Sequence, residues 1–193
     1  MKILVLGARA VAVCADRDHW LVFNATAEAA RHPTLQQAAR EGRVAALVLT
    51  DAQPEHAAGI AGLCQPHPLD LYVTPAVFEA LTSSAAWLDD PMGARPADLR
   101  WHLVAIAGDV RSVEFRIDGV AALSLRALAI DGPPGAAVGD CIALLVADRR
   151  DGQRLFFSPV LAGADALPWM QGADCVLVTG ALQPVPRDWE SVA

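Results

Sequence analysis

The chain is poor in lysine, in histidine and in closely spaced cysteines. Its 193 residues include one lysine, hence fourteen arginines, together with five histidines and four cysteines, and the formal net charge is -7. No basic cluster follows one face of the chain, so nucleic acid is not an expected partner. The cysteines form no C-x-x-C pair, and we expect four reduced core thiols rather than a disulfide framework or a zinc knuckle: Cys14, Cys64, Cys141 and Cys175.

Long apolar runs are also lacking. None is long enough to cross a bilayer, and Met1-Lys2 opens directly into a strand-like run without a charged leader. These absences predict a soluble, cytoplasmic chain with no membrane partner. Apolar residues make up 54% of the chain and charged residues 19%. We therefore expect one domain over residues 1–193 that buries a sizeable core.

The chain is organised around residues 44–64. Six apolar residues, 44–49, end at the polar run 50–56, which reads TDAQPEH, and a segment of small apolar residues follows. This pattern predicts a buried strand, a polar turn at its carboxyl end, and a helix packed closely through Gly59 and Gly62. Ligands of open α/β sheets bind at the carboxyl ends of strands, so we expect a chemical site at this turn.

The polar turn offers four candidate catalytic residues. Asp51, Gln53 and Glu55 stand at alternate positions and His56 follows at once, so a turn leaving the strand can aim several of them at one point. Asp51, Glu55 and His56 are candidate metal ligands, whereas the neutral amide of Gln53 is a poor ligand for a transition metal. A structural interpretation stays open, in which Asp51 and Thr50 cap the following helix and Glu55 complements its dipole.

The spacing of this turn resembles the H-x-H-x-D-H metal loop of the metallo-β-lactamase fold, with Asp51 and Gln53 at the two histidine positions. Within that superfamily, its D-x-Q-x-E-H form is similar to the D-x-Q-x-D-H loop of the pyrroloquinoline quinone (PQQ) biosynthesis protein B family. Four more segments resemble that family in the same order along the chain: residues 22–25, 139–150, 152–159 and 173–180.

The resemblance implies a fold, a chemistry and a cofactor. The fold is α/β, an αββα sandwich of the metallo-β-lactamase type, truncated at the C-terminus because the chain stops at Ala193 well before family members end. The implied chemistry is oxygen-dependent hydroxylation of a tyrosine- or peptide-derived precursor. One histidine with one or two carboxylates matches the ligand set of a non-haem iron site, and zinc is the other metal implied.

Later segments depart from the family pattern. Where relatives carry a histidine-bearing stretch, this chain has residues 133–138, PPGAAV, without a histidine. Pro159-Val160 stand where a bridging Asp is typical of the fold, and Thr179 stands where the family has an Asp. The family's Cys-containing structural zinc segment is also missing after Gly7. Iron, zinc and no metal at all are therefore equally open.

Two functions remain open from the sequence. The first is a metal-dependent oxygenase, hydroxylase or hydrolase of cofactor or natural-product biosynthesis that acts on a small-molecule or peptide-derived substrate. The second is a metal-free, degenerate family member that serves as a binding or partner subunit in the same pathway. Removal of terminal elements should expose a sheet edge or an apolar face, so we expect a homodimer or a complex with another pathway protein under either reading.

The remaining pattern predicts two meanders joined by helices. Three strands are expected within residues 2–25, a helix capped by Asn24 or Thr26, a strand at 70–74 and a helix from Pro75. Residues 82–98 predict a long surface loop. Hairpin turns are expected at Gly108-Asp109 and Asp118-Gly119. Later segments predict three more strands, a helix between the last two and an irregular tail: residues 141–148, 154–160, 174–180, 165–172 and 183–193.

Overall fold

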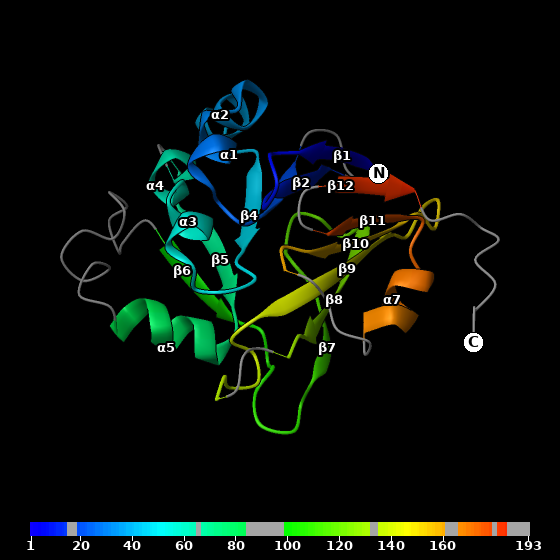
Figure 1. Ribbon diagram of the computed structural model, residues 1–193. Helices are drawn as coiled ribbons and strands as arrows, with labels where there is room; N and C mark the ends of the chain where they lie inside the picture. The colour runs from blue at the N-terminus through cyan, green and yellow to red at the C-terminus, as the bar shows by residue number, and fades with distance from the viewer. Residues whose placement is uncertain are drawn as a thin grey trace.

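Two six-stranded sheets lie face to face at the centre of the computed structural model (Figure 1). The structure describes residues 1–14, 19–64, 67–83, 99–131, 135–160 and 166–178, and the backbone alone of 181–184. The expected loop at 82–98 lies outside the described residues from position 84 onward. No helix within the described ranges is both long enough and apolar enough to cross a membrane.

The first sheet is built by the first half of the chain in sequence order. It begins as the predicted antiparallel meander and continues with parallel strands. We call it sheet 1; its strands are β1 (Lys2–Val5), β2 (Val11–Cys14), β3 (Trp20–Phe23), β4 (Val44–Val48), β5 (Leu69–Val73) and β6 (Leu99–Leu103).

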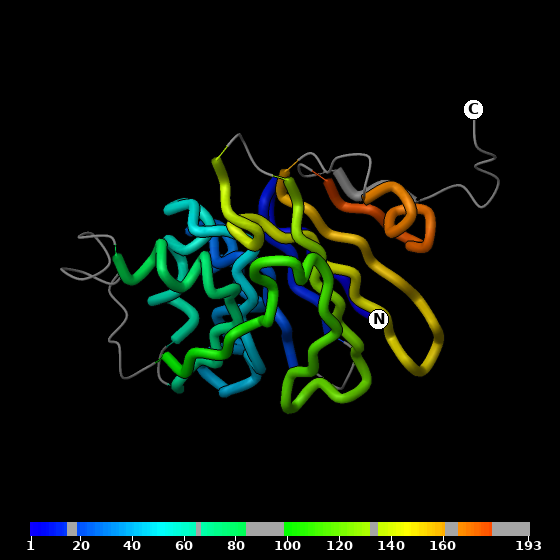
Figure 2. Tube along the Cα trace, turned by 90° about the horizontal axis from the view of Figure 1, so that it is seen from below, coloured from blue at the N-terminus to red at the C-terminus, as the bar shows by residue number. Residues whose placement is uncertain are grey.

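The second sheet is built by the second half of the chain, again in sequence order. Its pairs are antiparallel except for the parallel pair of β10 and β11. We call it sheet 2; its strands are β7 (Ser112–Phe115), β8 (Leu123–Ala129), β9 (Ile142–Asp148), β10 (Arg154–Ser158), β11 (Cys175–Val178) and β12 (Ala181–Pro184). Figure 2 shows how the two halves of the trace, blue to green and green to orange, lie beside each other.

Helices cover the outer face of each sheet. Sheet 1 is covered by α1 (Ala27–Arg31), α2 (Pro33–Arg40), α3 (Pro54–Ala57), α4 (Ile60–Leu63) and α5 (Pro75–Ser83), and sheet 2 by α7 (Leu167–Gln171). The predicted αββα sandwich is confirmed by this arrangement of layers. Thr26 caps α1, since its side-chain oxygen accepts a hydrogen bond from the Ala29 N–H at 3.1 Å.

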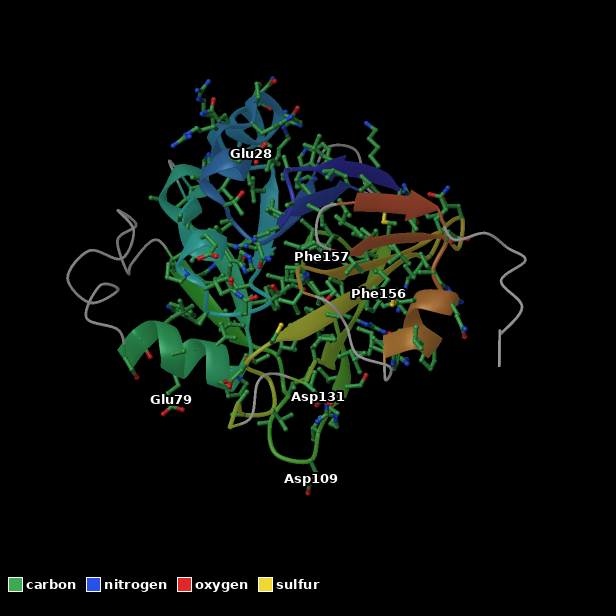
Figure 3. The ribbon with its side chains drawn as sticks, in the orientation of Figure 1. Glu28, Glu79, Asp109, Asp131, Phe156 and Phe157 are labelled. Atoms are coloured by element: carbon green, nitrogen blue, oxygen red, sulfur yellow. The ribbon has the colours of Figure 1, made fainter. Side chains whose placement is uncertain are left out.

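Alternation along the strands divides the interior into three layers of core. In β2 of sheet 1, Val11 and Val13 face sheet 2, while the alternate residues Ala12 and Cys14 face the helices. In β10, Phe157 packs between the sheets and its neighbour Phe156 packs under α7; both are labelled in Figure 3. Successive side chains of a strand point to opposite faces of the sheet. A strand with apolar residues at both odd and even positions is therefore buried on both faces.

Gly59 and Gly62 let the α3–α4 segment approach α1 closely, as the sequence predicted. A Cβ at Gly59 would lie 2.3 Å from the Thr26 carbonyl oxygen, and one at Gly62 would lie 3.0 Å from the Ala30 Cβ. The prediction of one helix was wrong, because the segment forms two short helices with Gly59 between them. The Gly59 N–H donates instead to the Ala25 carbonyl oxygen at 2.6 Å, which ties the break to the preceding loop.

Two other predictions were wrong. Gly108-Asp109 was expected to turn a hairpin, but β6 pairs with β5 in sheet 1 and β7 pairs with β8 in sheet 2, so this turn carries the chain from one sheet to the other. The tail was expected to be irregular over residues 183–193, yet its first two residues belong to β12 (Ala181–Pro184), which pairs antiparallel with β11; residues 185–193 lie outside the described residues. Period-two alternation identifies a strand but carries no information about which sheet it joins.

A buried ion pair joins the two sheets near the start of the chain. The Met1 ammonium lies 3.2 Å from Asp148 Oδ2, and both side chains are buried. Arg150 donates to the same carboxylate from its backbone N–H and its guanidinium, with the shortest contact 2.7 Å. The guanidinium, the Arg150 N–H and the Met1 ammonium, in that order, hold the pKa of Asp148 well below its usual range.

We expect Asp148→Asn to lower the free energy of unfolding by about 2 kcal/mol at pH 6, because charge-assisted hydrogen bonds are lost. A depressed folded-state pKa stabilises the fold above the unfolded pKa of about 3.9 and loses that effect as pH falls. The difference between wild type and variant should therefore shrink steadily below about pH 4. Urea unfolding across this range measures it. If the difference in the free energy of unfolding between wild type and Asp148→Asn stays constant down to about pH 2.5, the pKa of Asp148 is not lowered in the folded state.

Candidate functional site

The polar turn predicted from the sequence lies where the two sheets meet at one edge. It connects β4 to α3, and its first residue, Thr50, accepts a hydrogen bond at its carbonyl oxygen from the Ile142 N–H at 2.8 Å. Asp51 forms an isolated antiparallel bridge with Cys141, just before β9. The turn therefore follows the carboxyl end of a central strand of sheet 1 and touches sheet 2, the place where we expected a chemical site.

Asp51 and His56 form a buried pair at this turn. His56 Nδ1 lies 2.6 Å from Asp51 Oδ1, and their side chains are 1% and 6% exposed. Asp51 Oδ1 also accepts a hydrogen bond from the Gln53 N–H at 3.0 Å, which closes a turn at the entrance to α3. The N-cap of α3 is Gln53 rather than Asp51 or Thr50, so the predicted capping was wrong; Asp51 instead closes an Asx turn just before the helix.

The second ring nitrogen of His56 stands without a partner. Since a carboxylate only accepts, the Nδ1–H donates to Asp51, and the lone pair of a neutral ring is then on Nε2. His56 Nε2 is buried and has no hydrogen-bond partner among the residues that the structure describes. A buried polar atom left unsatisfied costs about 1–3 kcal/mol, so it requires an explanation.

Glu55 and Gln53 do not join the Asp51–His56 pair. The Glu55 side chain is half exposed and makes an ion pair with Arg9 from the loop between β1 and β2. A hydrogen bond from its own backbone N–H, and then Arg9, lower the pKa of the Glu55 carboxyl. Gln53 is partly buried and its side chain makes no capping hydrogen bond to α3.

Asn24 is a site residue that the sequence analysis missed, since it was considered only as a helix cap. Its side chain accepts from the Thr50 N–H at 3.0 Å and donates to Thr50 Oγ1 at 3.0 Å and to the Arg9 carbonyl oxygen at 2.9 Å. Asn24 is fully buried and adopts a φ of 60°. Asparagine directly after an apolar strand is the available sequence signal, because it tolerates left-handed backbone better than most residues.

Cys141 lies against the same turn. Burial, the Asp51 carboxylate and the Asp140 carboxylate raise the pKa of its thiol to about 12. The thiolate is the form that attacks electrophiles, so the raised pKa makes Cys141 a poor nucleophile at neutral pH. None of the four cysteines forms a disulfide; Cys14 and Cys64 are buried and Cys141 and Cys175 partly so.

The later positions identified by family resemblance add no ligand. Residues 135–138 contain no histidine, and at Pro159-Val160 the Ser158 hydroxyl donates to the Val160 carbonyl oxygen at 2.7 Å. Pro133, Pro134 and Thr179 lie outside the described residues. Within the ranges that the structure describes, no three His, Cys, Asp or Glu side chains come together as a metal site would require.

The number of side-chain donors that converge at the turn decides whether it suits a bound metal. Transition-metal sites in proteins use three or four protein donors. Only Asp51 and His56 converge here, and Asp51 Oδ1 already accepts two hydrogen bonds. The described residues therefore do not fit an iron or zinc ion by themselves.

A family comparison agrees with this fold. The family described as "Beta-lactamase superfamily domain" matches residues 19–189. The chain therefore belongs to the β-lactamase superfamily domain family.

Within that family the chain is similar to the proteins named "Coenzyme PQQ synthesis protein B". It is 31% identical to the protein of Stutzerimonas stutzeri and 33% identical to that of Azoarcus sp. (strain BH72). Each alignment covers 89% of this chain and 60% of the relative, so the chain spans about 60% of the length of these curated relatives.

Solved structures support the same fold. The zinc-bound PqqB of Methylobacterium extorquens superposes with a TM-score of 0.68 at 22% identity, covering 89% of this chain and 60% of that one. Human tRNase Z, short form, gives 0.58 at 15% identity, covering 91% and 76%. A B3 metallo-β-lactamase with an active-site glutamic acid gives 0.57 at 17% identity, covering 93% and 77%.

We expect Asp51→Ala to lower the free energy of unfolding by about 3 kcal/mol, because it removes two hydrogen bonds and leaves the buried Nδ1–H of His56 unpaired. Glu55→Ala is the matched control on the same turn, and its urea midpoint should equal that of the wild type because exposed ion pairs stabilise little. Urea unfolding of both variants measures the contrast. If Asp51→Ala and Glu55→Ala lower the free energy of unfolding equally, the buried pairing of Asp51 with His56 is not what stabilises the turn.

Proposed function

We propose that this chain acts in the synthesis of PQQ or a related quinone cofactor, as a binding or partner subunit that holds no metal by itself. The observation that carries the proposal is the pairing of Asp51 with His56. If both side chains were metal ligands they would turn toward the ion, whereas here the imidazole and a backbone N–H share one carboxylate oxygen. Similarity to the PQQ synthesis proteins supports the pathway.

The rest of the turn supports the same reading. Glu55, the third candidate ligand, is engaged with Arg9 in solvent, and Thr50 is bound to Asn24. Each of these contacts stabilises the loop as it stands. For Glu55 to serve as a metal ligand, its ion pair with Arg9 would have to break.

A second candidate function is a metal-dependent hydroxylase or hydrolase acting on a tyrosine- or peptide-derived precursor. The buried, unpartnered His56 Nε2 favours it, since a lone pair held by a carboxylate at the other ring nitrogen is how ligating histidines are oriented. Under this reading the missing ligands come from a partner chain or from outside the described residues.

Metal titration separates the two candidates. Protein purified without added metal should contain far less than one iron or zinc ion per chain by elemental analysis, and neither ion should bind appreciably on titration. His56→Ala should behave as the wild type does. Near-stoichiometric metal that His56→Ala loses and the control His102→Ala keeps would favour the hydroxylase or hydrolase instead. Deletion of the gene, with cofactor quantified by mass spectrometry, tests the pathway.

We further propose that the subunit pairs with a second copy of itself along β6. This strand is the last in sheet 1, and Leu103 at its end is 60% exposed. An edge strand with an exposed large apolar residue favours strand-to-strand association.

Light scattering should give about twice the chain mass of 20.3 kDa for the wild type. Leu103→Glu should return the mass to that of one chain, because it places charge on the edge. Val110→Glu is the control, since Val110 is also exposed, at 48%, but lies off the strand. A wild type that stays monomeric at high concentration, or a dimer that survives Leu103→Glu, would rule out this interface.

A further inference from the structure

A pocket of about 320 Å³ lies on the outer face of sheet 2 and is lined in part by Pro168 and Trp169 of α7. Its lining comes from four neighbouring strands and one helix. The polar turn of residues 50–56 contributes no residue to it. Its volume is in the range of small-molecule sites.

The register of sheet 2 explains the floor of this pocket. Arg154 of β10 pairs with Ala147 of β9, which pairs with Ser124 of β8, so these three side chains form one row across the outer face. In the next row, Leu145 of β9 pairs with Arg126 of β8, and Arg126 pairs with Glu114 of β7. The small side chains of Ala147 and Ser124 leave a hollow between the longer ones.

Two guanidinium groups face this hollow from opposite sides of β9. Arg126 and Arg154 stand on strands separated by one strand, which places their backbones about 10 Å apart across the sheet. Among the lining residues that the structure describes, Glu114 is the single carboxylate beside two guanidinium groups, so these residues together carry a net positive charge. Paired arginines are well suited to carboxylates, because each guanidinium offers a planar fork of N–H donors.

Contacts within the protein hold both arginine side chains in place, and these contacts do not use all of the guanidinium N–H donors. The Arg126 guanidinium carbon lies 5.1 Å from the centroid of the Trp169 ring, and its ion pair with Glu114 is long, at 3.6 Å. Arg154 Nη1 donates to the Gly172 carbonyl oxygen at 3.3 Å. Cation–π packing and a backbone acceptor reduce the side-chain entropy that binding would otherwise cost.

We infer that this pocket binds a small ligand with two carboxylate groups, one on Arg126 and one on Arg154, over the apolar floor of Leu145 and Ala147. The ligand is small because the pocket is small, and dianionic because two guanidinium groups stand on opposite sides of the floor. The inference does not depend on the proposed function, since none of the pocket residues belongs to the polar turn.

Calorimetric titration with benzene-1,3-dicarboxylate tests the site on the full chain. The wild type should bind it with a dissociation constant of about 1 mM or below. Arg126→Gln and Arg154→Gln should each weaken binding about tenfold or more, because each removes charge-assisted hydrogen bonds. Arg116→Gln is the matched control, since Arg116 is exposed and lies outside the pocket lining; its affinity should equal that of the wild type.

Two further measurements fix the cause of binding. The uncharged benzene-1,3-dicarboxamide should not bind, and Glu114→Gln should strengthen dicarboxylate binding severalfold, because it removes a competing and repelling carboxylate. All three pocket variants carry exposed substitutions, and their circular dichroism should match the wild type.

The inference is overturned if the dicarboxylate does not bind, if the diamide binds equally well, or if Arg116→Gln weakens binding as much as Arg126→Gln. Metal content and gene deletion test the proposed function separately, so failure of one leaves the other standing.

Discussion

One buried side chain amide holds the polar turn against the rest of the fold. Asn24 bonds to the Arg9 carbonyl oxygen, to the Thr50 N–H and to the Thr50 hydroxyl, so three separate segments meet at a single residue. Its own N–H donates to the Val48 carbonyl oxygen at 3.0 Å. Because Asn24 and Thr50 are fully buried, their polar groups would be unsatisfied without these partners. The position of Thr50 then determines where Asp51 and His56 can lie.

The same constraint explains why the motif resembles a metal loop yet is occupied by internal contacts. In the metal loop that it resembles, the polar residues at alternate positions would turn toward an ion. Here the first of them accepts from the backbone and from His56, and the third reaches outward to Arg9. Among the buried side-chain atoms that the structure describes, His56 Nε2 is without a hydrogen-bond partner. The turn therefore orients one histidine through a carboxylate, while its other polar groups bond within the protein.

Much of the fold could be predicted from the sequence, because apolar alternation and turn residues report local structure directly. The strands, the cap at Thr26 and the close approach at Gly59 and Gly62 all follow from such local signals. The membership of β6 in sheet 1 and the pairing of β12 could not, since both depend on contacts between distant segments. At the site, the sequence placed Asp51 and His56 together on one turn. It did not indicate that the Glu55 carboxylate would form an ion pair with Arg9, forty-six residues earlier in the chain.

The order of strands has a consequence for how the protein folds. One continuous half of the chain forms each sheet, residues 2–103 for sheet 1 and residues 112–184 for sheet 2. Within each sheet, every strand pairs with the strands that precede and follow it in sequence. Each half can therefore form its own hydrogen-bonded ladder without strands from the other, and an apolar layer joins the two sheets. The segment around Gly108, exposed and carrying no ladder, is then the natural place to cut the chain in two. Two such fragments carry complementary apolar faces, and on mixing they should reassemble into the same sandwich.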